Sequence, residues 1–216
     1  MSEWIAADWP APEHIVAGTI LKDAADTVLP LPGKPCLLDQ VHGTNVVTAG
    51  NFETRPRADG SVGSGSEHVC VVRTADCLPV LVCSADGRVF AAAHAGWRGL
   101  AAGVIENTLT KLAVDPSELL AWLGPAISQP SFEVGDEVRA AFVAVQPAAA
   151  ECFVRNGRGR WQADLYGLAR QRLESAGVRN IFGGGFCTFL DERRFHSFRR
   201  DPDCGRMVSF VGSKSP

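Results

Sequence analysis

Residues 74–113 read TADCLPVLVCSADGRVFAAAHAGWRGLAAGVIENTLTKLA, and they carry the clearest local signals of secondary structure in the chain. Two apolar runs, 79–83 and 88–94, flank the tetrapeptide SADG. An Asp-Gly pair between two apolar runs is a strong signal for a β-hairpin. Residues 98–113 then place apolar side chains at three- and four-residue steps, which predicts an amphipathic helix. The stretch therefore predicts a hairpin whose second strand leads into a helix.

Strand-like and helix-like segments alternate outside this stretch. Apolar runs predict strands at 36–41, 68–74, 119–124, 152–154, 180–186 and 207–212. Helical periodicity predicts helices at 135–145 and 164–176, the second between a favourable N-cap and a favourable C-cap glycine. Stretches rich in Pro and Gly, 30–35 and 59–65, predict loops. Hairpins mixed with helical crossovers indicate an α/β (α+β mixed) fold with mixed β-sheets.

The composition favours one domain over residues 1–216. The chain is 46% hydrophobic, which is enough to bury a core at this length. A net charge of -3 does not favour nucleic acid or an anionic membrane as a partner. We see no signal-peptide pattern and no apolar stretch long enough to span a membrane. The seven cysteines form no CxxC pair, so we expect free thiols and a cytoplasmic protein.

Three short segments carry side chains suited to chemistry, each where regular structure is predicted to stop. They are QVHG with His42, TADCLP with Cys77 and HAGWRG with His94. Two imidazoles and a thiolate suit a catalytic zinc site, which uses three protein ligands and leaves a fourth position for water or substrate. The same donors suit copper. The three residues match no local metal motif, so the fold must bring them together.

The same residues allow two other interpretations. Cys77 could act as the nucleophile of a cysteine hydrolase, with His94 as its base. The pocket could also bind a metabolite without catalysis. Asp59, Asp76 and Glu133 are candidate general acids or bases, although each has an ordinary interpretation as a turn former or surface carboxylate.

Arginines crowd into residues 193–206 of this otherwise acidic chain. A solvated charged face is one interpretation. A phosphate clamp is the other, because a guanidinium matches phosphate oxygens with two hydrogen bonds. Arg199 and Arg200 from this group, together with Arg98 of the HAGWRG segment, are the candidates for phosphate binding.

The ordered blocks extend beyond these segments and carry a resemblance. QVHG, ADG, TADCLPVLV, AAHAGWRGLAAGVIENTL, LGPAISQPSFEVGDEV and FHSFRRDPDCGRM occur in that order. Over residues 36–212 the chain resembles the YfiH-type family, named purine nucleoside phosphorylase, polyphenol oxidase or laccase-domain protein. The resemblance implies an α/β/β/α layering with mixed sheets. It also implies that His42, Cys77 and His94 are ligands of a metal, zinc or alternatively copper.

The resemblance also implies an activity. It suggests phosphorolysis of adenosine, inosine and methylthioadenosine to the free base and ribose 1-phosphate, with deamination of adenosine as a further reaction. Arg98, Arg199 and Arg200 would then neutralise phosphate, and Asp76 would move protons. Copper-dependent oxidation of phenols is the alternative that the family names offer. We expect a nucleoside and phosphate as the partners and a monomer or small homo-oligomer as the assembly.

Two departures from the family's pattern stand out. Residues 14–21 are short compared with relatives and lack the arginine of a Thr-Arg-Gly-Gly-like loop. Phe132 stands where relatives often have tyrosine, which keeps the ring and loses the hydroxyl.

Overall fold

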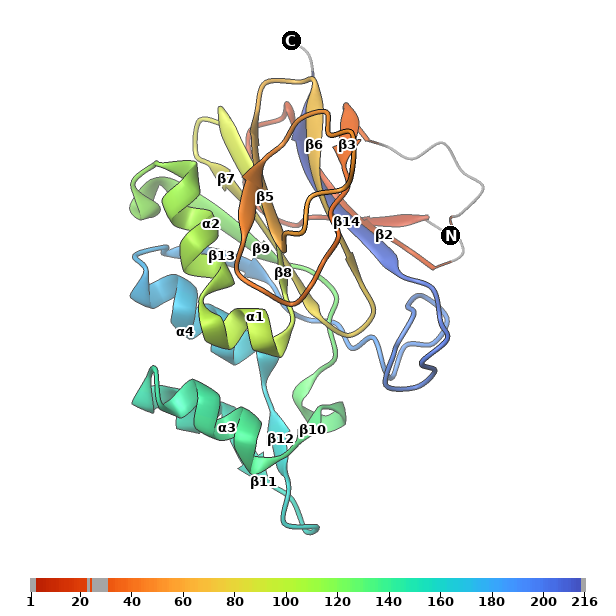
Figure 1. Ribbon diagram of the computed structural model, residues 1–216, viewed down its shortest axis with the longest axis vertical. Coiled ribbons are helices and arrows are strands. Elements are labelled where there is room, and N and C mark those ends of the chain that lie inside the picture. Colours follow the sequence, from red (N-terminus) through yellow and green to blue (C-terminus); the bar gives the residue numbers. More distant parts are fainter. Residues whose placement is uncertain (1–2, 23, 25–30, 215–216) are drawn as a thin grey trace.

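The expected hairpin lies at the centre of a six-stranded sheet in the computed structural model, which describes residues 3–22, 24 and 31–214 (Figure 1). Strand β7 (Leu78–Ser84) pairs antiparallel with β8 (Val89–Ala95). The strand order is β13-β9-β7-β8-β5-β4, with two parallel pairs, β13 with β9 and β4 with β5. The other members of this sheet are β4 (Val46–Thr48), β5 (Gly60–Ser64), β9 (Leu119–Leu123) and β13 (Asn180–Gly183).

A second, five-stranded sheet packs face to face on the first. Its order is β1-β2-β14-β6-β3, and β3 runs parallel to β6 whereas the other pairs are antiparallel. Its strands are β1 (Trp4–Ala6), β2 (Ile15–Ile20), β3 (Lys34–Cys36), β6 (His68–Thr74) and β14 (Met207–Ser213). The layer between the sheets includes Phe90 and Trp122 from the first sheet and Val72 and Val211 from the second, all buried.

Helices cover the other face of the six-stranded sheet (Figure 1). These are α1 (Trp97–Ala102), α2 (Val104–Leu112) and α4 (Leu165–Ser175). Below them lies α3 (Asp136–Val143) beside a small antiparallel sheet of β10 (Glu133–Val134), β12 (Trp161–Ala163) and β11 (Phe153–Arg155). Short 3₁₀ helices span Pro116–Glu118, Gln129–Ser131 and Pro147–Cys152. None of the helices in the described ranges is long and apolar enough to cross a membrane.

The mixed α+β class, the mixed sheets and the single domain are confirmed. The helices, the six-stranded sheet and the five-stranded sheet give three layers of the expected α/β/β/α order. Over the outer face of the five-stranded sheet, side chains such as Trp4, Leu31 and Leu37 pack on Val69 and Phe210. Within the part of the chain that the structure describes, this outer cover comes from strand and loop side chains.

Most predicted elements are confirmed, since β6, β7, β8, β9, β11, β13 and β14 lie on the predicted runs. Helices α3 and α4 also fall within the predicted ranges. The predicted helix over 98–113 is interrupted, however. Gly103 adopts a left-handed conformation with φ of 103° and ends α1 while starting α2. An L-residue rarely adopts this φ, so glycine permits the break.

Two predictions between residues 36 and 65 are wrong. The stretch 59–65 holds strand β5, and glycine serves there because a Cβ at Gly63 would lie 2.6 Å from the Phe90 ring. The predicted strand over 36–41 ends after Cys36. Beyond it the chain makes an isolated bridge at Asp39 and then forms a loop that carries His42. Both errors arise because the local apolar pattern does not show which tertiary neighbours pack against a segment, and strand formation depends on those neighbours. The pattern also missed β1, β2, β4, β10 and β12.

Candidate metal centre

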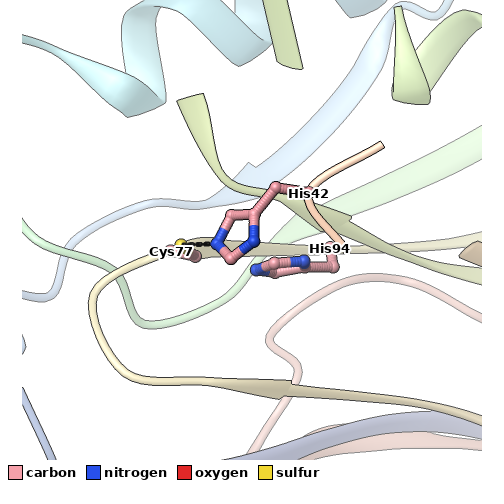
Figure 2. Close-up of side chains that lie close together, drawn as sticks. All are labelled: His42, Cys77 and His94. Carbon is pink, nitrogen blue, oxygen red and sulfur yellow. Dashed lines mark hydrogen bonds between the residues drawn. The ribbon is translucent and has the colours of Figure 1, made fainter. Parts of the chain in front are cut away.

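Three side chains from separate segments converge at one end of the central hairpin (Figure 2). His42 comes from a loop, Cys77 lies just before β7 and His94 lies on β8. Their potential ligand atoms all lie within 4.8 Å of one another, and Cys77 Sγ is 3.8 Å from His42 Nε2. The two imidazole rings meet edge to face, with centroids 4.8 Å apart. The fold therefore supplies the convergence that sequence spacing alone could not establish.

The His42 loop is held by the carboxylate of Asp59. His42 has a φ of 59°, in the left-handed region that a non-glycine residue rarely occupies. Three consecutive backbone N–H groups, those of Val41, His42 and Gly43, donate to Asp59 at 3.2, 2.9 and 2.7 Å. These hydrogen bonds stabilise the strained backbone and aim the His42 ring at the other two ligands.

Asp59 also orients His94. The aspartate is fully buried, and its Oδ1 lies 2.8 Å from His94 Nδ1. A proton on Nδ1 that is donated to the carboxylate leaves Nε2 as the free donor atom for a metal. Burial opposes ionisation of Asp59, but the hydrogen bonds from His94 and the loop amides outweigh it and lower the carboxyl pKa. Because Asp59 is buried and its oxygens accept hydrogen bonds from the His42 loop and from His94, its contacts favour a role in positioning the ligands. Its role as a general acid or base stays a prediction.

The electrostatics of the cluster favour a thiolate. Burial opposes ionisation of Cys77, yet hydrogen bonds with His42 and His94 outweigh it and lower the thiol pKa to about 6. Burial likewise disfavours the charged form of His94, but Asp59 and Cys77 raise its pKa to about 9. The metal-free site thus tends toward a thiolate beside an imidazolium. A divalent cation would replace the proton on the imidazole and keep the thiolate charged.

Gly96 leaves the space in which the ligands approach one another. A Cβ at this position would lie 2.9 Å from both Cys77 Sγ and His42 Cδ2. Any larger residue would push these two side chains apart, which explains a glycine immediately before α1. The close packing, the sulfur and nitrogen donors and the Asp59–His94 pair together fit a zinc or copper ion.

The three residues face a cavity of about 580 Å³. Its other lining residues are Asp39, Gln40, Arg73, Thr74, Ala75, Phe198, Cys204 and Arg206. Gln40 ties the His42 loop to the end of β6, because its side chain donates to the Arg73 carbonyl and accepts from the Arg73 N–H, each at 2.8 Å. Arg73 was missed by the sequence analysis, because a single arginine at a strand end carries no signal. Arg206 belongs to the arginine group over 193–206, for which a phosphate clamp is one of the two interpretations, but it was not among the residues chosen from that group.

Asp76 does not join the ligand cluster. Its Oδ1 accepts a hydrogen bond from the Thr188 hydroxyl at 2.6 Å. Its Oδ2 accepts from the Ser197 hydroxyl at 3.0 Å and from the Arg199 N–H at 2.7 Å. The carboxylate thus ties the turn before β7 to the long segment between β13 and β14.

The three arginines predicted to bind phosphate do not lie in one place. Arg98 and Arg199 line a separate cavity of about 380 Å³, together with Trp97, Phe132 and Glu133. The Arg200 guanidinium instead donates to the backbone carbonyls of residues 188, 189 and 195 at 2.7 to 3.0 Å. Arg200 is therefore occupied in holding its own segment, and Glu133 lies outside the metal cavity as an ion-pair partner of Arg158.

Comparison with known proteins adds a family and named relatives. Residues 21–214 match the family model described as multi-copper polyphenol oxidoreductase laccase. Purine nucleoside phosphorylase YfiH of Escherichia coli is 52% identical over 182 residues, which are 84% of this chain and 74% of the relative. Purine nucleoside phosphorylase PA4543 of Pseudomonas aeruginosa is 44% identical over 239 aligned residues, 98% of each chain. The crystal structure of Neisseria meningitidis protein NMB0706 has a TM-score of 0.94 at 39% identity, covering 99% of this chain and 100% of that one.

Proposed function

The chain belongs to the multi-copper polyphenol oxidoreductase laccase family, and from this premise we propose that it is a metal-dependent purine nucleoside phosphorylase. Relatives that align with 84% and 98% of the chain carry the name purine nucleoside phosphorylase. The observation that carries the proposal is the convergence of His42, Cys77 and His94 on one cavity. The proposed substrates are adenosine, inosine and methylthioadenosine with phosphate, and deamination of adenosine is the proposed second reaction.

The proposed metal is zinc, with copper as the alternative. His42 and His94 would supply nitrogen and Cys77 sulfur, which leaves a position open toward the cavity. When bound, the ion supplies a Lewis acid that polarises a substrate oxygen or makes a water molecule more acidic. Asp59 would keep His94 in the tautomer that exposes Nε2.

In phosphorolysis, a phosphate oxygen forms a bond to C1′ of the ribose while the bond from C1′ to the purine nitrogen breaks. The purine leaves and takes up a proton, and ribose 1-phosphate remains. The cavity of about 580 Å³ is of the size usual for small-molecule sites, roughly 300–1,000 Å³. Phe198 lines it with a ring that is 52% exposed, which provides a face on which a purine can stack.

Three residues predicted for the reaction, Asp76, Arg98 and Arg199, lie outside the lining of the metal cavity. Asp76 would reach a substrate only by releasing its hydrogen bonds to Thr188 or Ser197, so we propose that it positions the Phe198 segment. The assignment of Arg98 and Arg199 to phosphate stays a prediction.

Elemental analysis and a turnover screen test the proposal together. Purified protein should hold about one zinc or copper ion per chain and convert a nucleoside plus inorganic phosphate to base and ribose 1-phosphate. His94→Ala should lose both the ion and the turnover. His14→Ala is the matched control, since His14 lies at the hairpin turn, beside the Gly87 carbonyl. Full phosphorolysis by metal-stripped His94→Ala would refute the metal-centred proposal.

A cysteine hydrolase is the second candidate, because one observation favours it. Asp59, His94 and Cys77 form a chain in the order carboxylate, imidazole and thiol that also activates nucleophilic cysteines. If zinc protects Cys77 from alkylation and no acyl-enzyme is trapped, the result would favour the role of Cys77 as a metal ligand. An acyl-enzyme trapped on Cys77 would favour the hydrolase.

Oxidation of phenols is supported by the name of the family model. Laccase-type chemistry uses several copper ions. Within the described residues, His42, Cys77 and His94 form the one cluster of three potential ligands, and His14 and His68 lie elsewhere. Metal analysis combined with an assay under anaerobic conditions separates the two activities, because phosphorolysis needs no oxygen. The cytoplasmic location, the lack of a nucleic-acid partner and the monomer or small homo-oligomer stay predictions.

A further inference from the structure

We infer that the phosphate of the reaction is bound by Arg73 and Arg206, two guanidiniums that line the metal cavity from opposite parts of the chain. Arg73 lies in β6, and Arg206 lies just before β14. This inference rests on the proposed function, which it deepens by naming the residues that recognise the anionic substrate. It assigns phosphate to the cavity that holds the ligand cluster and not to the cavity of Arg98 and Arg199.

The Arg73 side chain is available to a ligand. Its backbone N–H and carbonyl are both paired with the Gln40 side chain, so the position of its Cα is well defined. The side chain is exposed, and its guanidinium has no hydrogen-bond or ion-pair acceptor among the described residues. A positioned but unpartnered arginine at a cavity wall is suited to bind an anion.

The Arg206 side chain is partly fixed and partly free. Its Nη1 donates to the carbonyls of Cys204 and Gly205 at 2.6 and 2.9 Å. The guanidinium carbon lies 5.7 Å from the centre of the Phe198 ring. These contacts hold the planar group in place, while Nε and Nη2 have no acceptor within the part of the chain that the structure describes. A fixed guanidinium with free N–H groups loses little entropy when it binds phosphate.

Each of the two cavities has one more arginine than carboxylates in its lining. Asp39 is the one carboxylate in the lining of the metal cavity outside the cluster, and it already lies 3.9 Å from Arg57. Arg73 and Arg206 therefore leave a positive charge that a phosphate dianion would neutralise. The second cavity is lined by Arg98, Arg160 and Arg199 with the carboxylates of Glu133 and Glu137, and Glu133 is already paired with Arg158. Charge therefore suits an anion in either cavity, and the assignment to the metal cavity rests on where the arginines lie.

Location supports the same assignment. Phosphate must meet the sugar carbon while the purine is bound, so phosphate and nucleoside must occupy one continuous cavity. The Arg206 guanidinium lies over the ring of Phe198, the exposed ring that we propose for the purine. An anion held by Arg73 and Arg206 would thus share one cavity with the ligand cluster and the base.

Steady-state kinetics with varied inorganic phosphate tests the inference. Arg73→Gln and Arg206→Gln should each raise KM for phosphate roughly tenfold to hundredfold, since each removes charge-assisted hydrogen bonds, while KM for the nucleoside changes little. Arg73→Lys and Arg206→Lys should lie between wild type and the Gln variants, because lysine keeps the charge and loses the fork. Arg88→Gln is the matched control, an exposed arginine at the hairpin turn. Thermal melting checks that every variant is folded.

The outcomes distinguish the inference from the proposed function. An unchanged phosphate KM in both Gln variants would overturn the inference, as would a rise confined to Arg98→Gln or Arg199→Gln. Should the wild type turn over no nucleoside, the proposed function fails, and calorimetric titration of the metal-loaded protein with inorganic phosphate decides the inference alone. Phosphate binding that Arg73→Gln and Arg206→Gln abolish would support it, and binding that both variants retain would overturn it.

Discussion

Asp59 and Asp76 are both buried aspartates that accept three or more hydrogen bonds, but they hold different regions of the site. Asp59 binds the amides of the His42 loop and the His94 ring, so it builds the metal end of the cavity. Asp76 binds Thr188, Ser197 and the Arg199 backbone, so it builds the end that carries Phe198. A buried carboxylate in a short motif can therefore position side chains at either end of the cavity. Its hydrogen-bond partners determine which end it supports.

Asp59→Asn should have the largest effect on metal binding. The amide has one oxygen in place of two, so it cannot accept all the hydrogen bonds that Asp59 accepts. It also lacks the negative charge that favours a proton on His94 Nδ1. Metal affinity should fall roughly 10- to 100-fold, as for other partners that orient a ligand. Competition with a chelator measures this, with Asp76→Asn as the comparison. Equal losses of affinity in the two variants would remove the distinction between the regions.

Asp76→Asn should lower stability more than metal affinity. The new amide nitrogen would face hydroxyl or N–H donors in a buried place, which should cost about 1–3 kcal/mol in the free energy of unfolding. Urea denaturation measures this, and Asp86→Asn at the hairpin turn is an exposed control. A variant as stable as wild type would show that the segment around Phe198 does not depend on Asp76.

Phe198→Ala should raise KM for the nucleoside about tenfold, because stacking of a base on an aromatic ring is lost. The KM for phosphate should change less. Leu190→Ala is the matched control, since Leu190 is an exposed apolar residue of the same segment outside the metal cavity. A KM for the nucleoside that is the same in both variants would place the purine elsewhere in the cavity.

The smallest effect should appear in the pH dependence of Cys77 alkylation in metal-free protein. Thiolate increases with pH, and a thiol pKa of about 6 predicts a midpoint near pH 6 and not near 9, the ordinary value. Asp59→Asn should move the midpoint upward, because His94 would then carry less positive charge beside the sulfur. Asp76→Asn should leave it in place. Iodoacetamide labelling with peptide mass spectrometry gives the midpoint for Cys77 itself.

The sequence predicted the parts of the site that end regular elements. Cys77 lies just before the first strand of a hairpin with an Asp-Gly turn and His94 lies near the end of the second, and that local pattern is confirmed. It assigned β5 to a loop, because Gly60 and Gly63 carry no apolar side chain to report their burial. For Asp59 and Asp76 it left open both a general acid or base role and an ordinary role as turn formers, because a carboxylate's sequence neighbours do not reveal its hydrogen-bond partners.

Local periodicity and residue types at strand ends were thus sufficient to predict the hairpin, half of the strands, the α+β class and the three candidate ligands. Only the tertiary structure shows that Asp59 accepts hydrogen bonds from both the His42 loop and His94, and that Arg73 lines the metal cavity. It also shows that the Arg200 guanidinium donates to backbone carbonyls of its own segment. The contacts of Asp59 and the cavity around Arg73 join residues that are distant in the chain, and those of Arg200 span 5 to 12 residues of irregular structure. Their energies depend on which side chains two packed sheets bring within hydrogen-bond distance, and no local window of sequence contains that information.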